Sequence, residues 1–280
     1  CWYSKDVMNS TDNFRFGVFS TGRGNSSKKL LKAALKQTRS NYIPATISFV
    51  FCNREKGEHE GTDEFLAMVE SHKIPLITLS FRKFRSEFRQ RYPESGDDWR
   101  IEYDQEILRK IEDFQVDAIA LAGYMLIFSK GGGIADTYNT VNLHPSRRGG
   151  PVGAWQDVIW QLIDDRSVKS GVMMHLTTDE LDRGPVVTHC VFSLRGPSLD
   201  DAWRALGDRT SNQVKNDEGE KNSLFKIIRE EHVKRESVLF VETLRSLALG
   251  LIKIDGLSVR NMRDENIDGY DLTTEIEANL

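Results

Sequence analysis

The chain contains few cysteines and no long apolar run. Among its 280 residues are 3 cysteines, Cys1, Cys52 and Cys190, which lie far apart. No pair has the CxxC spacing of a redox or zinc motif, so the sequence indicates neither a disulfide framework nor a metal site. No apolar stretch reaches the roughly 20 residues that span a bilayer, and the N-terminus has no signal-peptide pattern. We therefore expect a cytoplasmic protein that makes no membrane contact.

The sequence also lacks an excess of one charge. It has 38 Lys and Arg against 42 Asp and Glu, a formal net charge of −4, and no dense basic block. This balance argues against nucleic-acid binding. Hydrophobic residues make up 39 % of the chain, which is enough for a sizeable core at this length. We expect small-molecule substrates, and a monomer or homodimer.

Strand and helix patterns alternate through the first half of the chain. Apolar, β-branched segments at 14–21, 45–52, 74–79 and 116–121 read as strands. Helical patterns at 28–37, 62–72 and 99–114 lie between them. This alternation predicts an α/β fold with a doubly wound, mostly parallel sheet, whose ligands bind at the carboxyl ends of the strands.

Several further segments are predicted from their composition and apolar pattern. The mixed charges of residues 81–100 favour a surface loop, and a long helix is expected from 223 to 249 with a closing strand at 251–254. We interpret 1–12 as a disordered leader, 207–222 as an exposed polar insertion and 257–280 as an acidic tail without a catalytic part. One domain then covers 13–256, with halves at about 13–122 and 123–256.

The stretch from 140 to 146 carries the most chemistry. If residues 140–144 form a strand, Asn142 and His144 point to one side and Leu143 to the other. About 40 residues later, a loop rich in carboxylates ends in Gly184-Pro185. An Asp from that loop could orient His144. An amide, an imidazole and a carboxylate suit acyl transfer, in which a carbonyl oxygen becomes negative and a proton is relayed.

A glycine turn follows the first strand and precedes a helix. Glycines let backbone N–H groups approach an anion, the helix N-terminus favours negative charge, and Ser26 or Ser27 can cap the helix. This layout is typical of phosphate binding, although tight turns without a ligand also use glycine. The residues concerned are Gly22, Arg23, Gly24, Asn25 and Ser26.

Two motifs resemble the catalytic core of the 10-formyltetrahydrofolate-dependent formyltransferases. They are Asn-Leu-His-Pro-Ser at 142–146 and His-Leu-Thr-Thr-Asp-Glu-Leu-Asp-Arg-Gly-Pro at 175–185, in the family's order and spacing. Within the family, the members that act on glycinamide ribonucleotide in de novo purine biosynthesis resemble the chain most. The resemblance implies a Rossmann-like sheet with an antiparallel C-terminal extension, 10-formyltetrahydrofolate as co-substrate, and no metal.

The resemblance also implies roles for particular residues. Asn142, His144 and Asp182 would be catalytic, with a protonated His144 kept stable by Asp182, and His175 would lie close by. The glycine turn would hold the ribonucleotide phosphate, and Glu231 would contact the same substrate. The folate would lie against a set comprising Met125, Leu126, Ile127, Phe128, Asp179 and Glu180.

One loop departs from the family pattern. After Ser146 the family usually has two apolar residues and proline, whereas this chain has Arg147-Arg148-Gly149-Gly150 before Pro151. The two arginines could meet an anion or be solvated. The change leaves other functions open: a formyltetrahydrofolate hydrolase, a nucleotide-sugar amine formyltransferase, or an inactive folate- or nucleotide-binding homologue.

Overall fold

A single large sheet forms the centre of the molecule. The computed structural model describes residues 13–94, 98–178 and 180–280, and in this part of the chain eight strands pair in the order β10-β7-β6-β5-β4-β1-β2-β3. Five of them are parallel: β1 (Phe14–Ser20), β2 (Ala45–Cys52), β3 (Leu76–Thr78), β4 (Ala118–Leu121) and β5 (Thr140–His144). Next to β5, β6 (Lys169–Leu176) pairs antiparallel with both β5 and β7 (Val186–Ser193), so β7 again runs in the direction of β5. The predicted parallel sheet with an antiparallel extension is confirmed.

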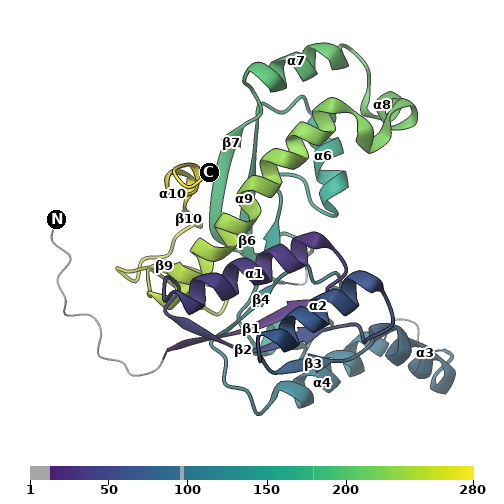
Figure 1. Cartoon of the computed structure of the whole chain (residues 1–280), viewed down its shortest axis with the longest axis vertical. Coiled ribbons are helices and arrows are strands. Elements are labelled where there is room, and N and C mark those ends of the chain that lie inside the picture. The colour runs from purple at the N-terminus through teal and green to yellow at the C-terminus, as the bar shows by residue number, and fades with distance from the viewer. Residues whose placement is uncertain (1–12, 95–97, 179) are drawn as a thin grey trace.

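Helices cover both faces of this sheet (Figure 1). One apolar cluster joins the strands to α1 (Asn25–Arg39), α2 (Glu60–Ser71) and the second half of α9 (Ser223–Ala248). A second cluster on the opposite face, rich in aromatic rings, joins them to α3 (Phe81–Arg91), α4 (Trp99–Ile111) and α5 (Ile134–Thr137). Because side chains alternate along a strand, the parallel strands bury apolar residues on both sides. The fold is therefore doubly wound.

A smaller core lies beyond the main sheet. It contains α6 (Trp155–Asp164), α7 (Pro197–Leu206), α8 (Ser211–Asp217) and the first half of α9. The segment 207–222 was predicted to be an exposed insertion, and most of its residues are exposed. It is nevertheless ordered: Thr210 caps α8 through Gln213, Val214 is fully buried, and a 3-10 turn spans Gly219–Lys221.

The prediction of a surface loop at 81–100 was wrong. Residues Phe81–Arg91 form α3, whose first turn is capped by the Ser80 hydroxyl, which accepts from the backbone N–H of Lys83. Phe84 and Phe88 lie four residues apart, so both point to one side of the helix and pack into the aromatic cluster. The many charged residues around these two phenylalanines concealed the helical period.

The segment 257–280, predicted as an acidic tail after the domain, is instead folded onto it. The segment 251–254, expected to close the sheet, instead contributes to β8 (Ile252–Asp255), which pairs with β9 (Ser258–Asn261) in a separate two-stranded sheet. The chain then returns, and β10 (Tyr270–Asp271) joins the main sheet beside β7, followed by α10 (Thr273–Glu277). Leu272 and Ile276 are buried. The predicted leader, 1–12, lies outside the described residues.

A buried histidine links α9 to the start of β6. His232 is fully buried, and its Nε2 lies 2.8 Å from the hydroxyl of Ser170. Burial, together with the charges of Arg229 and other nearby groups, lowers the pKa of His232 to about 3.

Although α9 has 26 residues, no described helix is both long and apolar enough to cross a membrane.

The buried His232 predicts an acid-sensitive stability. In the unfolded chain, His232 binds a proton below about pH 6.5, the usual pKa of histidine. In the folded chain it binds that proton only below about pH 3. The free energy of unfolding should therefore fall by up to about 1.4 kcal/mol per pH unit from this group as the pH drops. Urea unfolding at several pH values from 7 to 4 should show a shallower dependence in His232→Gln, and parallel curves would contradict the assignment.

Candidate active site

Two neighbouring strands bring three polar side chains to one face of the sheet. In the β5–β6 register, Asn142 lies opposite His175 and His144 lies opposite Met173. Directly opposite residues of paired strands share a face, so both imidazoles and the amide project together. Asn142 Nδ2 lies 3.3 Å from His175 Nε2, and His175 Nδ1–H donates to the Leu176 carbonyl oxygen at 2.9 Å. His175 Nε2 is thus left to face the Asn142 amide.

The carboxylate of Asp182 lies between the two histidines. Its Oδ2 is 3.6 Å from His144 Nδ1, and its Oδ1 is 3.5 Å from His175 Nε2. The backbone N–H of Gly153 donates to Oδ2 at 3.0 Å. Asp182 is only 9 % exposed, and its φ of 53° places it in the left-handed region. The loop after β6 therefore supplies the acid that the sequence assigned to it, and His175 is as close to that acid as His144.

The charges of this group follow from its burial and its neighbours. Burial raises the pKa of Asp182, but hydrogen bonding to His175 and Gly153 and the charge of His144 outweigh it, so the pKa lies below its usual value. For His144, burial lowers the pKa, and the opposing effect of Asp182 does not compensate. At neutral pH the site thus holds a carboxylate beside a neutral His144. The protonated His144 expected from the sequence is not the favoured state of this arrangement.

Both ring nitrogens of His144 face protein groups. Since a carbonyl oxygen only accepts, Nε2 carries the proton that it donates to the Pro151 oxygen at 2.9 Å. Only 3 % of His144 is exposed. The Pro151 carbonyl and the Gly153 N–H are contacts that the sequence analysis missed, because backbone groups leave no side-chain signature. The only local signal was the glycine-rich composition of this loop, in which Gly149 and Gly153 have positive φ.

The arginines of the same loop contact the chain itself. Arg148 forms an ion pair with Asp268, in the segment between β9 and β10. The guanidinium of Arg147 donates to the carbonyl oxygen of the next residue, Arg148, at 3.4 Å. Arg183, on the Asp182 loop, donates to the Gly150 carbonyl oxygen at 3.2 Å. These contacts tie the loop that covers His144 to the loop that carries Asp182 and to the C-terminal segment.

A cavity of about 520 Å³ adjoins Asp182. Its walls come from the two loops just described and from the C-terminal segment, at residues 257–259 and 266–268. Residues that the sequence analysis assigned to a tail thus border the pocket of the buried carboxylate. Among the described residues, no group of three or more His, Cys, Asp or Glu is arranged to hold a metal ion.

The glycine turn predicted to bind phosphate, the cradle (residues 22–26), follows the end of β1. Gly22 has a φ of 64°, and α1 begins at Asn25 with Gly24 as its extended N-cap, without a side-chain cap. Ser26 and Ser27 therefore lie inside the first turn, and the prediction that one of them caps the helix was wrong. The exposed residues of this turn are Arg23, Gly24, Asn25 and Ser26.

Glu231, the other predicted substrate contact, is already engaged. Its carboxylate accepts from Lys234 and, at 2.7 Å, from Arg235. Arg235 in turn binds Glu277 of α10 at 2.6 Å. Glu231 is thus held within a network on α9.

The predicted folate wall follows β4, which ends at Leu121. Met125 is 72 % exposed and Ile127 is 57 % exposed. Leu126 and Phe128, between and after them, pack against the aromatic cluster below. The backbone N–H of Met125 donates to the Thr21 hydroxyl at 3.0 Å. This bond joins the segment after β4 to the segment after β1, which carries the cradle. Glu180 is exposed, and Asp179 lies outside the described residues.

Comparison with known proteins identifies relatives of this arrangement. Residues 15–194 match the model of the family described as Formyl transferase. Phosphoribosylglycinamide formyltransferase of Escherichia coli is 29 % identical over 180 residues, which cover 64 % of this chain and 74 % of that protein. Among solved structures, the phosphoribosylglycinamide formyltransferase of Coxiella burnetii has a TM-score of 0.64 at 17 % identity, covering 93 % of this chain and 99 % of that one. A formyltetrahydrofolate deformylase from Pseudomonas syringae has a TM-score of 0.59 at 18 % identity, covering 89 % and 66 %.

The Asp182 loop depends on Gly184. A Cβ at this position would lie 1.8 Å from the Leu176 carbonyl oxygen, so a side chain would force the loop away from β6. Gly184→Ala should lower the free energy of unfolding by roughly 1–3 kcal/mol, the usual range for overpacking. As a control, Gly24→Ala should cost less in urea unfolding, because no atom lies within 4 Å of its added Cβ and only the poorer N-cap preference of Ala acts. Equal stability of the two variants would contradict the predicted clash.

Proposed function

The chain belongs to the formyl transferase family, and from this premise we propose that it transfers a formyl group from 10-formyltetrahydrofolate to the amine of glycinamide ribonucleotide. The proposed reaction is a one-carbon transfer of de novo purine biosynthesis in the cytoplasm. The observation that carries the proposal is the buried Asp182 carboxylate between His144 and His175, beside the amide of Asn142. These are the groups that formyl transfer to an amine needs.

In the proposed reaction, the acceptor nitrogen attacks the formyl carbon and the carbonyl electron pair moves to oxygen. The Asn142 amide has a second N–H besides the one directed at His175, and it donates to that oxygen. His144 Nε2–H donates as well, once the substrate oxygen replaces the Pro151 carbonyl that now lies 2.9 Å away. A neutral N–H donor and a half-buried amide stabilise the developing charge.

In this scheme, Asp182 accepts a proton from the amine and returns it to the leaving folate nitrogen. The attacking amine loses a proton as its bond to the formyl carbon forms, and the leaving folate nitrogen gains one as the old bond breaks. A carboxylate whose pKa lies below its usual value is ionised at neutral pH and can accept this proton, directly or through water. Its charge also favours protonation of His144 when the oxyanion forms.

Two surfaces support the assignment of the substrates. The uncapped N-terminus of α1 and the exposed turn before it suit a phosphate, because orphan N–H groups and the helix dipole attract anions. The exposed Met125 and Ile127 side chains offer an apolar wall for the flat ring of the formyl donor. Glu231 would have to release Lys234 or Arg235 to contact the acceptor.

Removing the acid or the imidazole should abolish most of the activity. Asp182→Asn and His144→Ala should each lower kcat by roughly 10²- to 10⁴-fold, the usual contribution of general acid–base groups. The change in substrate binding should be small, since neither variant alters the cradle. Asp201→Asn, which removes an exposed carboxylate of α7, serves as the control and should retain the wild-type rate. A near-normal kcat in either site variant would remove that residue from the mechanism.

The identity of the acceptor is tested by one assay. Tetrahydrofolate production from 10-formyltetrahydrofolate is followed with and without glycinamide ribonucleotide. Turnover that depends on the amine supports the transferase. Turnover without the amine would assign a hydrolase, and no turnover under either condition would assign a binding protein.

A further inference from the structure

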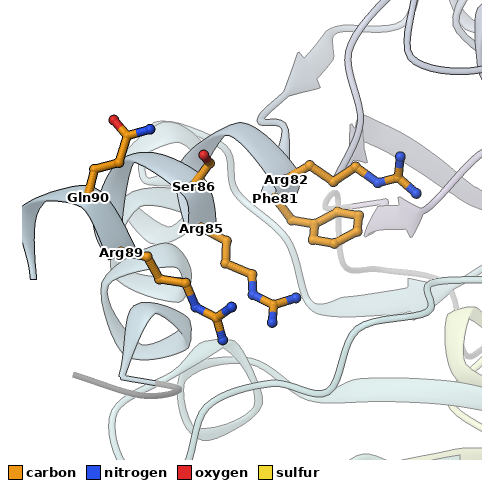
Figure 2. A pocket seen from close by; sticks show the side chains of 6 residues that line it. All are labelled: Phe81, Arg82, Arg85, Ser86, Arg89 and Gln90. Carbon is orange, nitrogen blue, oxygen red and sulfur yellow. The ribbon is translucent and has the colours of Figure 1, made fainter. Parts of the chain in front are cut away.

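An arginine-lined groove runs along α3, away from the groups assigned to formyl transfer. It has a volume of about 600 Å³ and is lined by Phe81, Arg82, Arg85, Ser86, Arg89 and Gln90. Figure 2 shows that Arg85 and Arg89 extend side by side, whereas Arg82 extends from the start of the helix in another direction. Phe84 and Phe88 anchor α3 in the aromatic cluster, so the groove is built on a fixed element.

The strand register brings the start of this groove close to the cradle. Ser20 of β1 lies opposite Cys52 of β2, and Cys52 lies opposite Thr78 of β3. Three loops thus leave the same edge of the sheet side by side, at the spacing of about 4.8 Å between neighbouring strands. Each loop delivers an arginine within four residues of its strand end. These residues form a row: Arg23, Arg54 and Arg82.

Arg54, in the middle of the row, is built into the protein. It is 5 % exposed, and its Nε is buried without a hydrogen-bond partner in the described part of the chain. The carboxylate of Glu58 lies 3.9 Å from its guanidinium, beyond good hydrogen-bond distance. The ring of Phe81 has Arg54 at 5.6 Å and Arg82 at 5.9 Å from its centroid. Two guanidinium groups therefore lie near one aromatic ring.

Other polar groups beside Arg54 also lack partners. Asn53 is fully buried, and neither the nitrogen nor the oxygen of its side chain has a hydrogen-bond partner among the described residues. Its backbone N–H donates to the Ser20 carbonyl, and its own carbonyl accepts from Phe81 N–H, so the residue lies between the cradle and α3. Buried polar groups are rarely left unpaired in folded proteins. Their concentration here indicates a site for a polar ligand.

The electrostatics point to an anionic ligand. Burial lowers the pKa of Arg54, and the like charges of Arg82 and Arg23 lower it further; the charge of Glu58 opposes them but does not compensate. Within the described residues, no acidic side chain forms an ion pair with Arg23 or Arg82. An anion placed among the three arginines would offset this repulsion and supply oxygen acceptors to the unpaired donors.

We infer that Arg54 and Arg82 form a second phosphate subsite beside the cradle, so that the protein also binds acceptors in which a second phosphoryl group follows the first. The inference rests on the proposed function, in which the cradle holds the first phosphate and the acceptor amine points to His144. The second phosphoryl group then binds beside Phe81, and the ester substituent of that phosphoryl group lies in the α3 groove. The acceptor class extends from a monophosphate ester to a diphosphate ester.

Inorganic phosphate and pyrophosphate provide the probes for this subsite. Calorimetric titration of the full chain should give a dissociation constant for pyrophosphate that is at least about tenfold lower than for phosphate, the effect expected of an added charge-assisted pair. The ratio of the two constants should fall toward one in Arg82→Ala, a change at an exposed side chain. Arg91→Ala removes the same charge from the same helix outside the groove and should keep the wild-type ratio.

Each outcome of this titration decides the inference. A ratio near one in the wild-type chain, or a ratio that is the same in Arg82→Ala as in Arg91→Ala, would overturn it. Competition with glycinamide ribonucleotide in the turnover assay separates the two proposals. If phosphate competes and pyrophosphate gains nothing from Arg82, the cradle assignment stands and the second subsite fails. If neither anion competes, the phosphate role of the cradle fails as well.

Discussion

The burial of one negative charge between two imidazoles is the constraint around which the site is arranged. A carboxylate with little solvent contact is stable only if protein groups replace its water. Here the N–H of Gly153 donates to the carboxylate at 3.0 Å, and His144 Nδ1 and His175 Nε2 lie 3.6 and 3.5 Å from its oxygens. These groups come from different segments, so the loops after β5 and after β6 can adopt few other arrangements without leaving the charge unpaired. Stability and chemistry thus depend on the same contacts.

The order of the strands explains why separate segments meet there. In a doubly wound sheet, the loops that follow parallel strands leave from one edge, and the change of direction at β6 returns the chain across that edge. The glycine turn after β1, the apolar wall after β4 and the histidine at the end of β5 therefore lie on one side of the molecule. In the proposed reaction, the acceptor and the formyl donor would therefore bind at neighbouring loops.

The sequence predicted most of this arrangement, and its errors have physical causes. β2 and β5 were predicted with the bounds observed, because their apolar residues form short uninterrupted or alternating runs. α3 was missed because Phe84 and Phe88 stand among many charged neighbours. The C-terminal strands were missed because β10 is two residues long and is stabilised by pairing with β7, a distant contact that local pattern does not encode. Asn142 and His144 were found from their spacing on one strand and Asp182 from the resemblance to the family, whereas the Pro151 carbonyl and Gly153 N–H have no residue-type signal.

The pairing of β10 with β7 also protects one side of the sheet. β7 is eight residues long, and without β10 its outer backbone groups would offer a template to any extended chain. The opposite edge, β3, has only three residues and offers little to pair with. Recombinant versions that lack β10 would therefore expose β7 as an unpaired edge strand, and we expect such versions to aggregate during expression.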